Sequence, residues 1–221
     1  MATVEQLLFG YRHGHELIAG SRELTAAQLR EVMPHVDASL EGTEEHQLVG
    51  VWISSVERYL LARIWPAPEQ SRPGAVWAHA LLIDAEDLRA RPLAALPTML
   101  RRPDEAAVNG YGEHLGWPAH GEPLRVPPAL GRALVNATLP GDDRPRVVLW
   151  RAPQQAESAL VALLDAMPST RRPGLSFRTR ERVRPGASAY RVQVAASLRG
   201  ASAGADAAAP VIDAREAPPA G

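Results

Sequence analysis

Tyr11, His13, His15 and His79 are the residues whose types and spacing could support acid–base or metal chemistry. His13 and His15 are two residues apart, so on a strand both side chains would point to one face, as in some metal sites. With His79 as a third ligand and one open position, such a site would suit a hydrolytic metal. Gly14 lies between the first two histidines and favours a hairpin turn, which would remove their alignment. We therefore expect no metal and no other cofactor, and the His13, His15 and His79 site remains the alternative.

His79 lies in an apolar segment, residues 75–83, and shares a strand face with Trp77. A neutral buried histidine needs partners for both ring nitrogens, and Tyr11, His15 and Ser21 are the candidates. If His79 met Tyr11 or His15, the pair could act as an acid–base couple, because histidine titrates near neutral pH. We favour the other interpretation, in which His79 is a hydrogen-bonded core residue that fixes the packing between strands.

Four arginines alternate with other residues near the end of the chain: Arg178, Arg180, Arg182 and Arg184. On a strand they would form a row on one face with steps of about 6.6–6.8 Å, close to the spacing of backbone phosphates. These are the candidate binding residues if the protein contacts nucleic acid. Aromatic residues for base stacking are few, with only Phe177 and Tyr190 nearby. The alternative is a solvated strand face that arginines protect from aggregation.

Other catalytic signatures are missing from the sequence. There is no cysteine and no lysine, which excludes thiolate or lysine chemistry and disulfides. There is no G-x-x-x-x-G-K-[ST], G-x-G-x-x-G, H-E-x-x-H or G-x-S-x-G motif. The chain itself is therefore not a P-loop GTPase.

Composition and charge place the chain among globular proteins. The chain is 46% hydrophobic and has a net charge of −1. Its length of 221 residues suits one large domain or two small ones. Residues 1–120 carry a net charge of −6 and residues 121–200 a net charge of +7. This asymmetry could mark a basic patch, but we favour attraction between two halves of one fold. No signal peptide is visible and the apolar runs are far shorter than the ~20 residues that span a bilayer, so we expect no membrane contact and a cytoplasmic location.

Residue patterns predict one α+β domain over residues 1–198, with a mostly antiparallel sheet and flanking helices. Residues 199–221 are rich in Ala, Pro and Gly, and we predict a disordered tail there. Both faces of 75–83 are nearly apolar, which predicts a central strand covered on both sides. The predicted strands are residues 4–11, 15–19, 47–54, 58–65, 75–83, 146–150, 175–183 and 189–197. The predicted helices are one from a capping box at Thr25 to about Met33, and residues 92–100, 128–139 and 154–167.

Three segments together carry a family resemblance. The first contains Gln6-Leu7, Phe9-Gly10-Tyr11, Gly14-His15, Leu17, Ala19 and Ser21. The second runs from Arg58-Tyr59, Leu61-Ala62-Arg63 and Trp65 to Arg72-Pro73-Gly74, Val76-Trp77, His79 and Leu81-Leu82, and the third contains Leu175-Ser176-Phe177 and Thr179. Over most of residues 5–195, the chain resembles the N-terminal domain, type 1, of the bacterial GTPase-associated proteins.

The resemblance implies a core component of multi-gene systems centred on a GTPase, with roles in biological conflict such as phage defence. It implies a non-enzymatic interaction or sensor module whose partners are a GTPase or other proteins encoded nearby. His15 and His79 are the family-like positions, whereas His13 is not part of the pattern. Family proteins usually continue into middle and C-terminal domains that this sequence does not include. The alternatives are a metal- or histidine-dependent hydrolase using His15 and His79, and a nucleic-acid binder using the row from Arg178 to Arg184.

Overall fold

The structure is a computed structural model of the whole chain. The residues that it describes are 2–37, 40, 45–70, 72–103, 105–121, 123–139, 144–183, 190–198 and 210–215. Their strands are β1 (Thr3–Tyr11), β2 (His15–Gly20), β3 (Gln47–Ile53), β4 (Arg58–Pro66), β5 (Val76–Ile83), β6 (Leu115–Gly116), β7 (Arg146–Leu149), β8 (Phe177–Val183), β9 (Val192–Leu198) and β10 (Val211–Asp213). Their helices are α1 (Ala26–Val36), α2 (Ala85–Ala90), α3 (Leu96–Met99), α4 (Pro128–Thr138) and α5 (Ala156–Ala166), with the short 3-10 helices η1 (Glu105–Gly112), η2 (Pro153–Gln155) and η3 (Ser169–Gly174).

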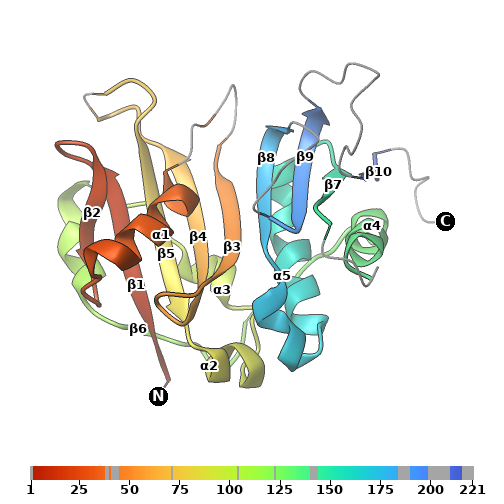
Figure 1. The fold of residues 1–221 in the computed structure, drawn as a ribbon, viewed down its shortest axis with the longest axis horizontal. Helices are drawn as coiled ribbons and strands as arrows, with labels where there is room; N and C mark the ends of the chain where they lie inside the picture. Colours follow the sequence, from red (N-terminus) through yellow and green to blue (C-terminus); the bar gives the residue numbers. More distant parts are fainter. Residues whose placement is uncertain are drawn as a thin grey trace.

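The strands form one mixed sheet in the order β10-β7-β9-β8-β3-β4-β5-β1-β2, and β6 adds to the start of β1 (Figure 1). Strands β1 to β5, together with β6 and the contact between β3 and β8, pair antiparallel. Strands β8, β9, β7 and β10 pair parallel, and α5 lies on the connection from β7 to β8. The predicted α+β fold with a mostly antiparallel sheet is confirmed, while the parallel group was not expected.

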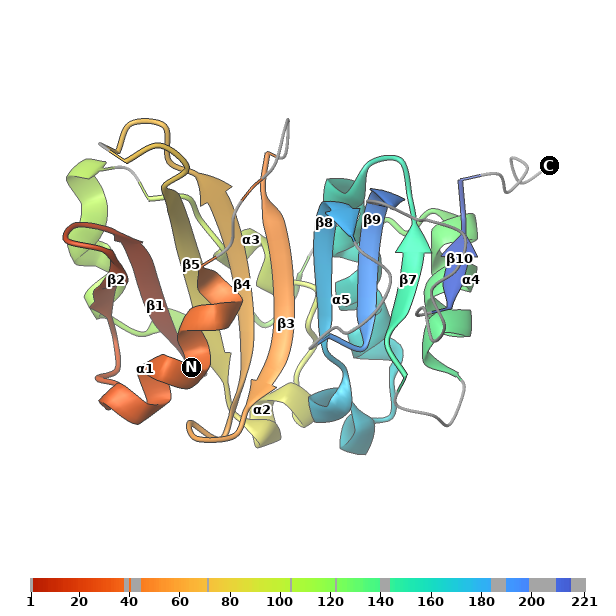
Figure 2. The ribbon, with the colours of Figure 1, turned by 45° about the horizontal axis from the view of Figure 1, so that its top comes forward.

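Helices cover the two faces of the sheet unequally (Figure 2). Helix α1 packs on one face, where its Val32 and Val36 meet strand residues such as Leu60. Helices α2 to α5 lie on the other face, in a larger cluster that includes Leu88, Leu160 and Tyr59. Strand β5 is buried along its whole length, as expected from its two apolar faces. The longest helices among the described residues have 11 residues, and none of these helices is long and apolar enough to cross a bilayer.

Two predicted helices differ from the structure at their ends. The capping box of Thr25 and Gln28 is present, but α1 continues past Pro34 to Val36. Proline removes one hydrogen bond, and burial of Val36 offsets that cost. Helix α2, capped by Asp84, was not predicted, and it ends before Pro92 because the residue preceding a proline favours an extended backbone, as Arg91 shows with a ψ of 150°. The helix predicted for residues 92–100 is confined to Leu96–Met99.

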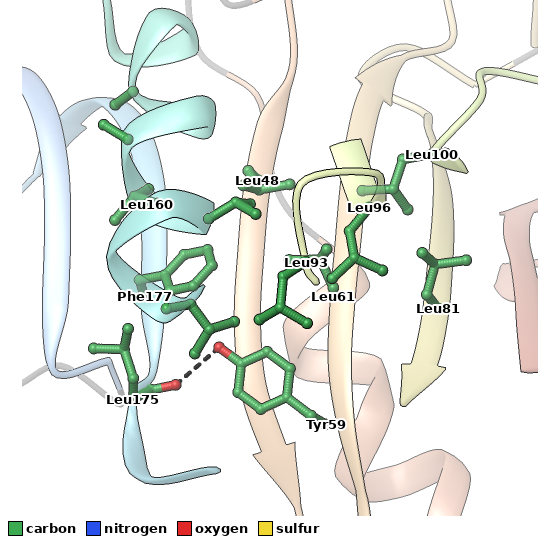
Figure 3. Close-up of a cluster of buried hydrophobic side chains, with 14 of the residues drawn as sticks. Leu48, Tyr59, Leu61, Leu81, Leu93, Leu96, Leu100, Leu160, Leu175 and Phe177 are labelled. Atoms are coloured by element: carbon green, nitrogen blue, oxygen red, sulfur yellow. Dashed lines mark hydrogen bonds between the residues drawn. The ribbon is translucent and has the colours of Figure 1, made fainter. Parts of the chain in front are cut away.

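The antiparallel and parallel parts of the sheet meet at a seam between β3 and β8 (Figure 3). The Tyr59 hydroxyl donates to the Leu175 carbonyl at 2.9 Å, and the Leu48 amide donates to the Thr179 hydroxyl at 2.8 Å. Gly50 allows this close approach, since a Cβ there would lie 2.5 Å from the Phe177 ring. The two parts thus share one continuous core.

Charged side chains also connect the two parts of the sheet, but their signs are opposite to the net charges of the two halves of the chain. Arg63 on β4 binds the buried Glu157 carboxylate of α5 through two hydrogen bonds, with Nε 3.1 Å from Oε1. His46 Nε2 lies 2.9 Å from the same carboxylate oxygen. The acidic half therefore contributes the Arg63 cation and the basic half the Glu157 anion, so this specific pair rather than the net charges accounts for the contact.

Part of the predicted disordered tail is ordered. Residues 211–213 form the edge strand β10, which pairs parallel with β7 from Val211 opposite Val147 to Asp213 opposite Leu149. The β-branched residues Val211 and Ile212 favour a strand. The prediction of disorder gave more weight to the Ala, Pro and Gly residues around them. Residues 199–209 and 216–221 lie outside the described residues.

Candidate functional site

Tyr11 and His15 are brought together at the turn end of the β1–β2 hairpin. They are directly opposite each other in the register of the two strands, so both side chains lie on the face that α1 covers. The turn at residues 12–14 is closed by a hydrogen bond from the Arg12 amide to the Gly14 carbonyl at 3.1 Å. The hairpin turn expected at Gly14 is therefore present, and it separates His13 from His15.

His13 points away from the other candidates. Its side chain is 96% exposed, and its Nδ1 lies 3.9 Å from a Glu16 carboxylate oxygen. The row of His13 and His15 on one strand face, which a shared metal site would need, is not formed.

His79 is fully buried and both of its ring nitrogens are hydrogen-bonded. Nδ1 accepts from the Arg101 amide at 3.0 Å, which leaves Nε2 to donate to Gln6 Oε1 at 2.9 Å. The Gln6 amide in turn donates to the carbonyls of Gly110 and Glu113. These partners replace the expected Tyr11, His15 or Ser21, and the network ties residues 101–113 to β1 and β5. Burial, reinforced by the nearby charges of Arg101 and Arg63, lowers the pKa of His79 to about 3.

His15 and His79 lie on opposite faces of the sheet. Leu8 is opposite His79 in the register and belongs to the α2–α5 side, whereas Phe9 stacks on His15 and belongs to the α1 side. The strand backbones therefore stand between the two imidazoles, and the structure does not form the acid–base couple. Among the described residues, no group of three or more histidine and acidic side chains is placed to hold a metal ion.

The structure instead places Tyr11 and His15 in a cleft of about 280 Å³. The hairpin forms one side, Asp37 at the C-terminal cap of α1 forms a second, and the third consists of residues 72–75 of the β4–β5 loop with Val76 at the start of β5. In that loop, the Ala75 amide donates to the Arg72 carbonyl at 3.0 Å and Gly74 has a φ of 77°. Proline followed by a left-handed glycine is typical of a type II turn, which explains why Arg72-Pro73-Gly74 holds this shape.

Arg72 and His15 give the cleft its electrostatic character. The Arg72 guanidinium lies over the Tyr11 ring, 5.4 Å from its centre, and is solvent-exposed. Burial lowers the pKa of His15, while the Asp37 carboxylate and a hydrogen bond to the Val36 backbone oppose that shift. His15 is therefore neutral at pH 7. Its Nε2 is buried and has no hydrogen-bond partner.

The predicted arginine row is not an open surface. Arg178 is only 5% exposed, its Nε donates to Gln47 Oε1 at 3.0 Å, and its guanidinium lies over the Tyr190 ring. Tyr190 in turn contacts His35 of α1, with its hydroxyl 2.8 Å from Nδ1. Arg178 thus helps to seat α1 on the sheet. Arg180 is half-buried, while the side chain of Arg182 and the whole of Arg184 lie outside the described residues.

Sequence reasoning missed Asp37 and the role of Arg72. Nothing in the sequence marks Asp37, because only the packing of α1 on the sheet brings its C-terminus beside His15. For Arg72 a signal was available, since the Pro-Gly pair that follows it predicts a type II turn at a fixed place between two strands.

The fold and the cleft define a mixed α+β chain whose candidate site is a binding cleft on one sheet face. Residues 3–100 match the family model described as GTPase-associated protein 1, N-terminal domain type 1. This confirms the resemblance, over a shorter range than the predicted 5–195, and the matched range includes every residue that lines the cleft. Searches of curated proteins and of solved structures found no significant match.

Proposed function

We propose that the protein is a non-enzymatic interaction or sensor module of a bacterial GTPase-centred multi-gene system of the conflict or defence type. The match of residues 3–100 to a GTPase-associated domain is the observation that carries this proposal. Its partner would be a GTPase or another protein encoded nearby, and it would act in the cytoplasm. We place the interacting domain at residues 1–198.

The geometry supports a binding role better than a catalytic one. His79 and Arg178, the most buried of the candidate side chains that the structure describes, are engaged in packing and hydrogen bonds within the fold. A general acid–base pair needs both groups within about 3 Å of the reacting atoms, and His15 and His79 lie on opposite sheet faces. Phosphate binding by the arginine row would need Arg178 on the surface, whereas it is buried. We therefore advance neither the hydrolase nor the nucleic-acid hypothesis.

The test is affinity purification of the tagged chain from its native cells, followed by reconstitution with the purified candidate. Mass spectrometry should recover a GTPase or a neighbouring gene product in near-stoichiometric amount, and the two purified proteins should form a complex in analytical ultracentrifugation. The tag alone serves as control bait. Failure of every recovered GTPase or neighbouring gene product to bind the purified chain would overturn the proposal, as would recovery of the chain alone.

A further inference from the structure

Two further concavities adjoin the cleft at different walls. The first lies in the β4–β5 loop, has a volume of about 390 Å³ and shares Arg72 and residues 73–75 with the cleft. The second lies along α1, has a volume of about 380 Å³ and shares Asp37 with the cleft. Because neighbouring concavities share lining residues, the three form one groove, which runs from a loop end through the cleft to a helix end.

We propose that this groove binds a short linear segment of a partner protein, in which an acidic residue is flanked by apolar residues. The inference rests on the proposed function, for which it names the binding surface and the chemistry of the partner segment. The described residues that line the groove lie between Tyr11 and Val76. All of them are therefore within residues 3–100, which match the GTPase-associated domain.

Both ends of the groove offer apolar surface. At the loop end, Pro68 and Pro73 line the wall and are exposed. At the helix end, the wall contains Leu29, Met33 and Pro34, of which the first two are four residues apart and so lie on one side of α1. Removal of apolar surface from water contributes about 25 cal/mol per Å², so each end can hold an apolar side chain of the partner.

Between these ends the groove presents an unpaired cation. Arg72 lines both the cleft and the loop end, and its exposed guanidinium is supported by the Tyr11 ring, 5.4 Å from the ring centre. The described residues provide no acidic partner for it. The charged residues that line the groove are Arg30, Asp37 and Arg72, and two cations and one anion leave a net charge of +1. A carboxylate of the partner can therefore bind the Arg72 guanidinium through two parallel hydrogen bonds.

The loop wall is held in its shape before a partner binds. The Tyr11 amide donates to Gln70 Oε1 at 3.2 Å, which ties the loop to the hairpin. Glu69 Oε1 accepts from the Trp77 indole at 2.7 Å, which ties the loop to β5. A wall that is already ordered reduces the conformational entropy lost on binding.

The shape of the groove favours a polypeptide over a small ligand. Ligand pockets typically enclose most of a small molecule, whereas this groove is open along its length, since Pro34, Asp37, Arg72 and Pro73 are all exposed. An extended polypeptide places side chains on one side at intervals of about 6.6–6.8 Å. It can therefore reach successive parts of the groove with an apolar, an acidic and a second apolar side chain.

The test is selection from a phage-displayed library of random short peptides on the purified full chain, followed by isothermal titration calorimetry of the selected peptides. These peptides should share an aspartate or glutamate with an apolar residue on each side. Arg72→Glu should weaken their binding by about tenfold or more, because attraction is replaced by repulsion. A peptide whose acidic residue is replaced by arginine should regain affinity for this variant.

Pro68→Asp and Pro34→Glu test the two apolar ends, and each should weaken binding. Both prolines are exposed, and glutamate suits a helix interior better than proline, so these variants keep the fold. Arg132→Glu and Leu139→Glu are the matched controls for charge reversal and for loss of an apolar side chain. Both residues are exposed, on α4 and at its C-terminal cap, outside the groove, and should leave the affinity unchanged.

Four outcomes would overturn the inference. These are a selection that yields no binding peptide, selected peptides without a shared acidic residue, unchanged affinity in Arg72→Glu, and a dimer of the chain that Arg72→Glu dissociates, which would assign the groove to a second copy. The experiment contains no GTPase, so the two proposals fail separately. Peptide binding in the groove without any GTPase or neighbouring gene product bound to the chain would leave the groove assigned and remove the proposed function. A GTPase that binds Arg72→Glu as well as the wild type would do the reverse.

Discussion

His79 is a titratable residue that the fold uses for packing. It occupies the interior of β5 and joins β1 to residues 101–113 through Gln6, and Tyr111 packs edge-on against its ring with the ring centres 4.9 Å apart. Because burial lowers its pKa to about 3, it stays neutral in the folded protein throughout the physiological pH range. In the unfolded chain it would take up a proton below about pH 6.5.

This difference predicts a pH-dependent contribution to stability. Since the unfolded state binds the extra proton, the free energy of unfolding should fall as pH drops below about 6.5, with His79 contributing about 2 kcal/mol of loss by about pH 5. Urea unfolding of His79→Gln at about pH 7 and about pH 5 should show a smaller loss than the wild type. His15 and His35, whose pKa values are also lowered, leave some pH dependence in the variant.

His13→Gln is the control for this measurement, because His13 is exposed and should leave the pH dependence as in the wild type. Equal losses in His79→Gln and the wild type would show that His79 is not buried as a neutral group.

At the scale of elements, the seam between β3 and β8 holds the two parts of the sheet together. Only Val49–Arg178 and Gly50–Phe177 are paired across it in the described strands, so side chains carry much of the contact. Tyr59 lies fully buried beside the seam, and burial raises the pKa of its hydroxyl well above the usual value. The hydroxyl therefore remains a donor to the Leu175 carbonyl at all accessible pH values.

Tyr59→Phe should remove this hydrogen bond without changing the shape of the core. The Leu175 carbonyl would lose its donor inside the protein, which should lower the free energy of unfolding by about 1–3 kcal/mol in a urea titration. Tyr11→Phe is the matched control: Tyr11 is only half-buried, and we expect a change within about 0.5 kcal/mol. A loss for Tyr59→Phe no larger than that of the control would mean that the seam does not depend on this bond.

At the scale of the whole molecule, the core extends across the boundary of the family match. Residues 3–100 match the GTPase-associated domain, yet Leu48, Tyr59 and Leu93 belong to the same buried cluster as Leu160 and Phe177 (Figure 3). Core residues of the matched segment therefore pack against residues beyond it.

We expect a fragment of residues 1–103 to lack a cooperative fold. Removing the rest of the chain would expose the β3 edge and the apolar residues that face α5 and β8. Its amide NMR spectrum should be poorly dispersed and its urea transition broad, whereas the full chain should unfold in one sharp step. A fragment that unfolds sharply at the same urea concentration as the full chain would contradict this expectation.

Much of the fold was predictable because its signals are local. Alternating apolar residues marked β1 to β5 and β7 to β9 within a few residues, and the Thr25 capping box marked the start of α1. Two errors concern helices: burial of Val36 carries α1 past Pro34, and of the helix predicted for residues 92–100 only Leu96–Met99 forms, while α2 before Pro92 was missed. The parallel pairing of β8, β9 and β7 was not predictable. The order and direction of strands in a sheet depend on how segments far apart in the sequence pack over one core.

The sequence by itself determined the class of fold, the positions of most elements and the GTPase-associated resemblance, because these depend on residue patterns over short stretches. Only the tertiary structure decided which of the candidate site residues meet. His15 and His79 looked equivalent in the sequence, but the register of β1 with β2 and β5 places them on opposite faces. The same packing brings Asp37 and Arg72, which are 35 positions apart in the chain, to one cleft. Such contacts form because different helices bury the two faces of the sheet. Which residues meet therefore depends on the packing of the whole chain and not on any short segment.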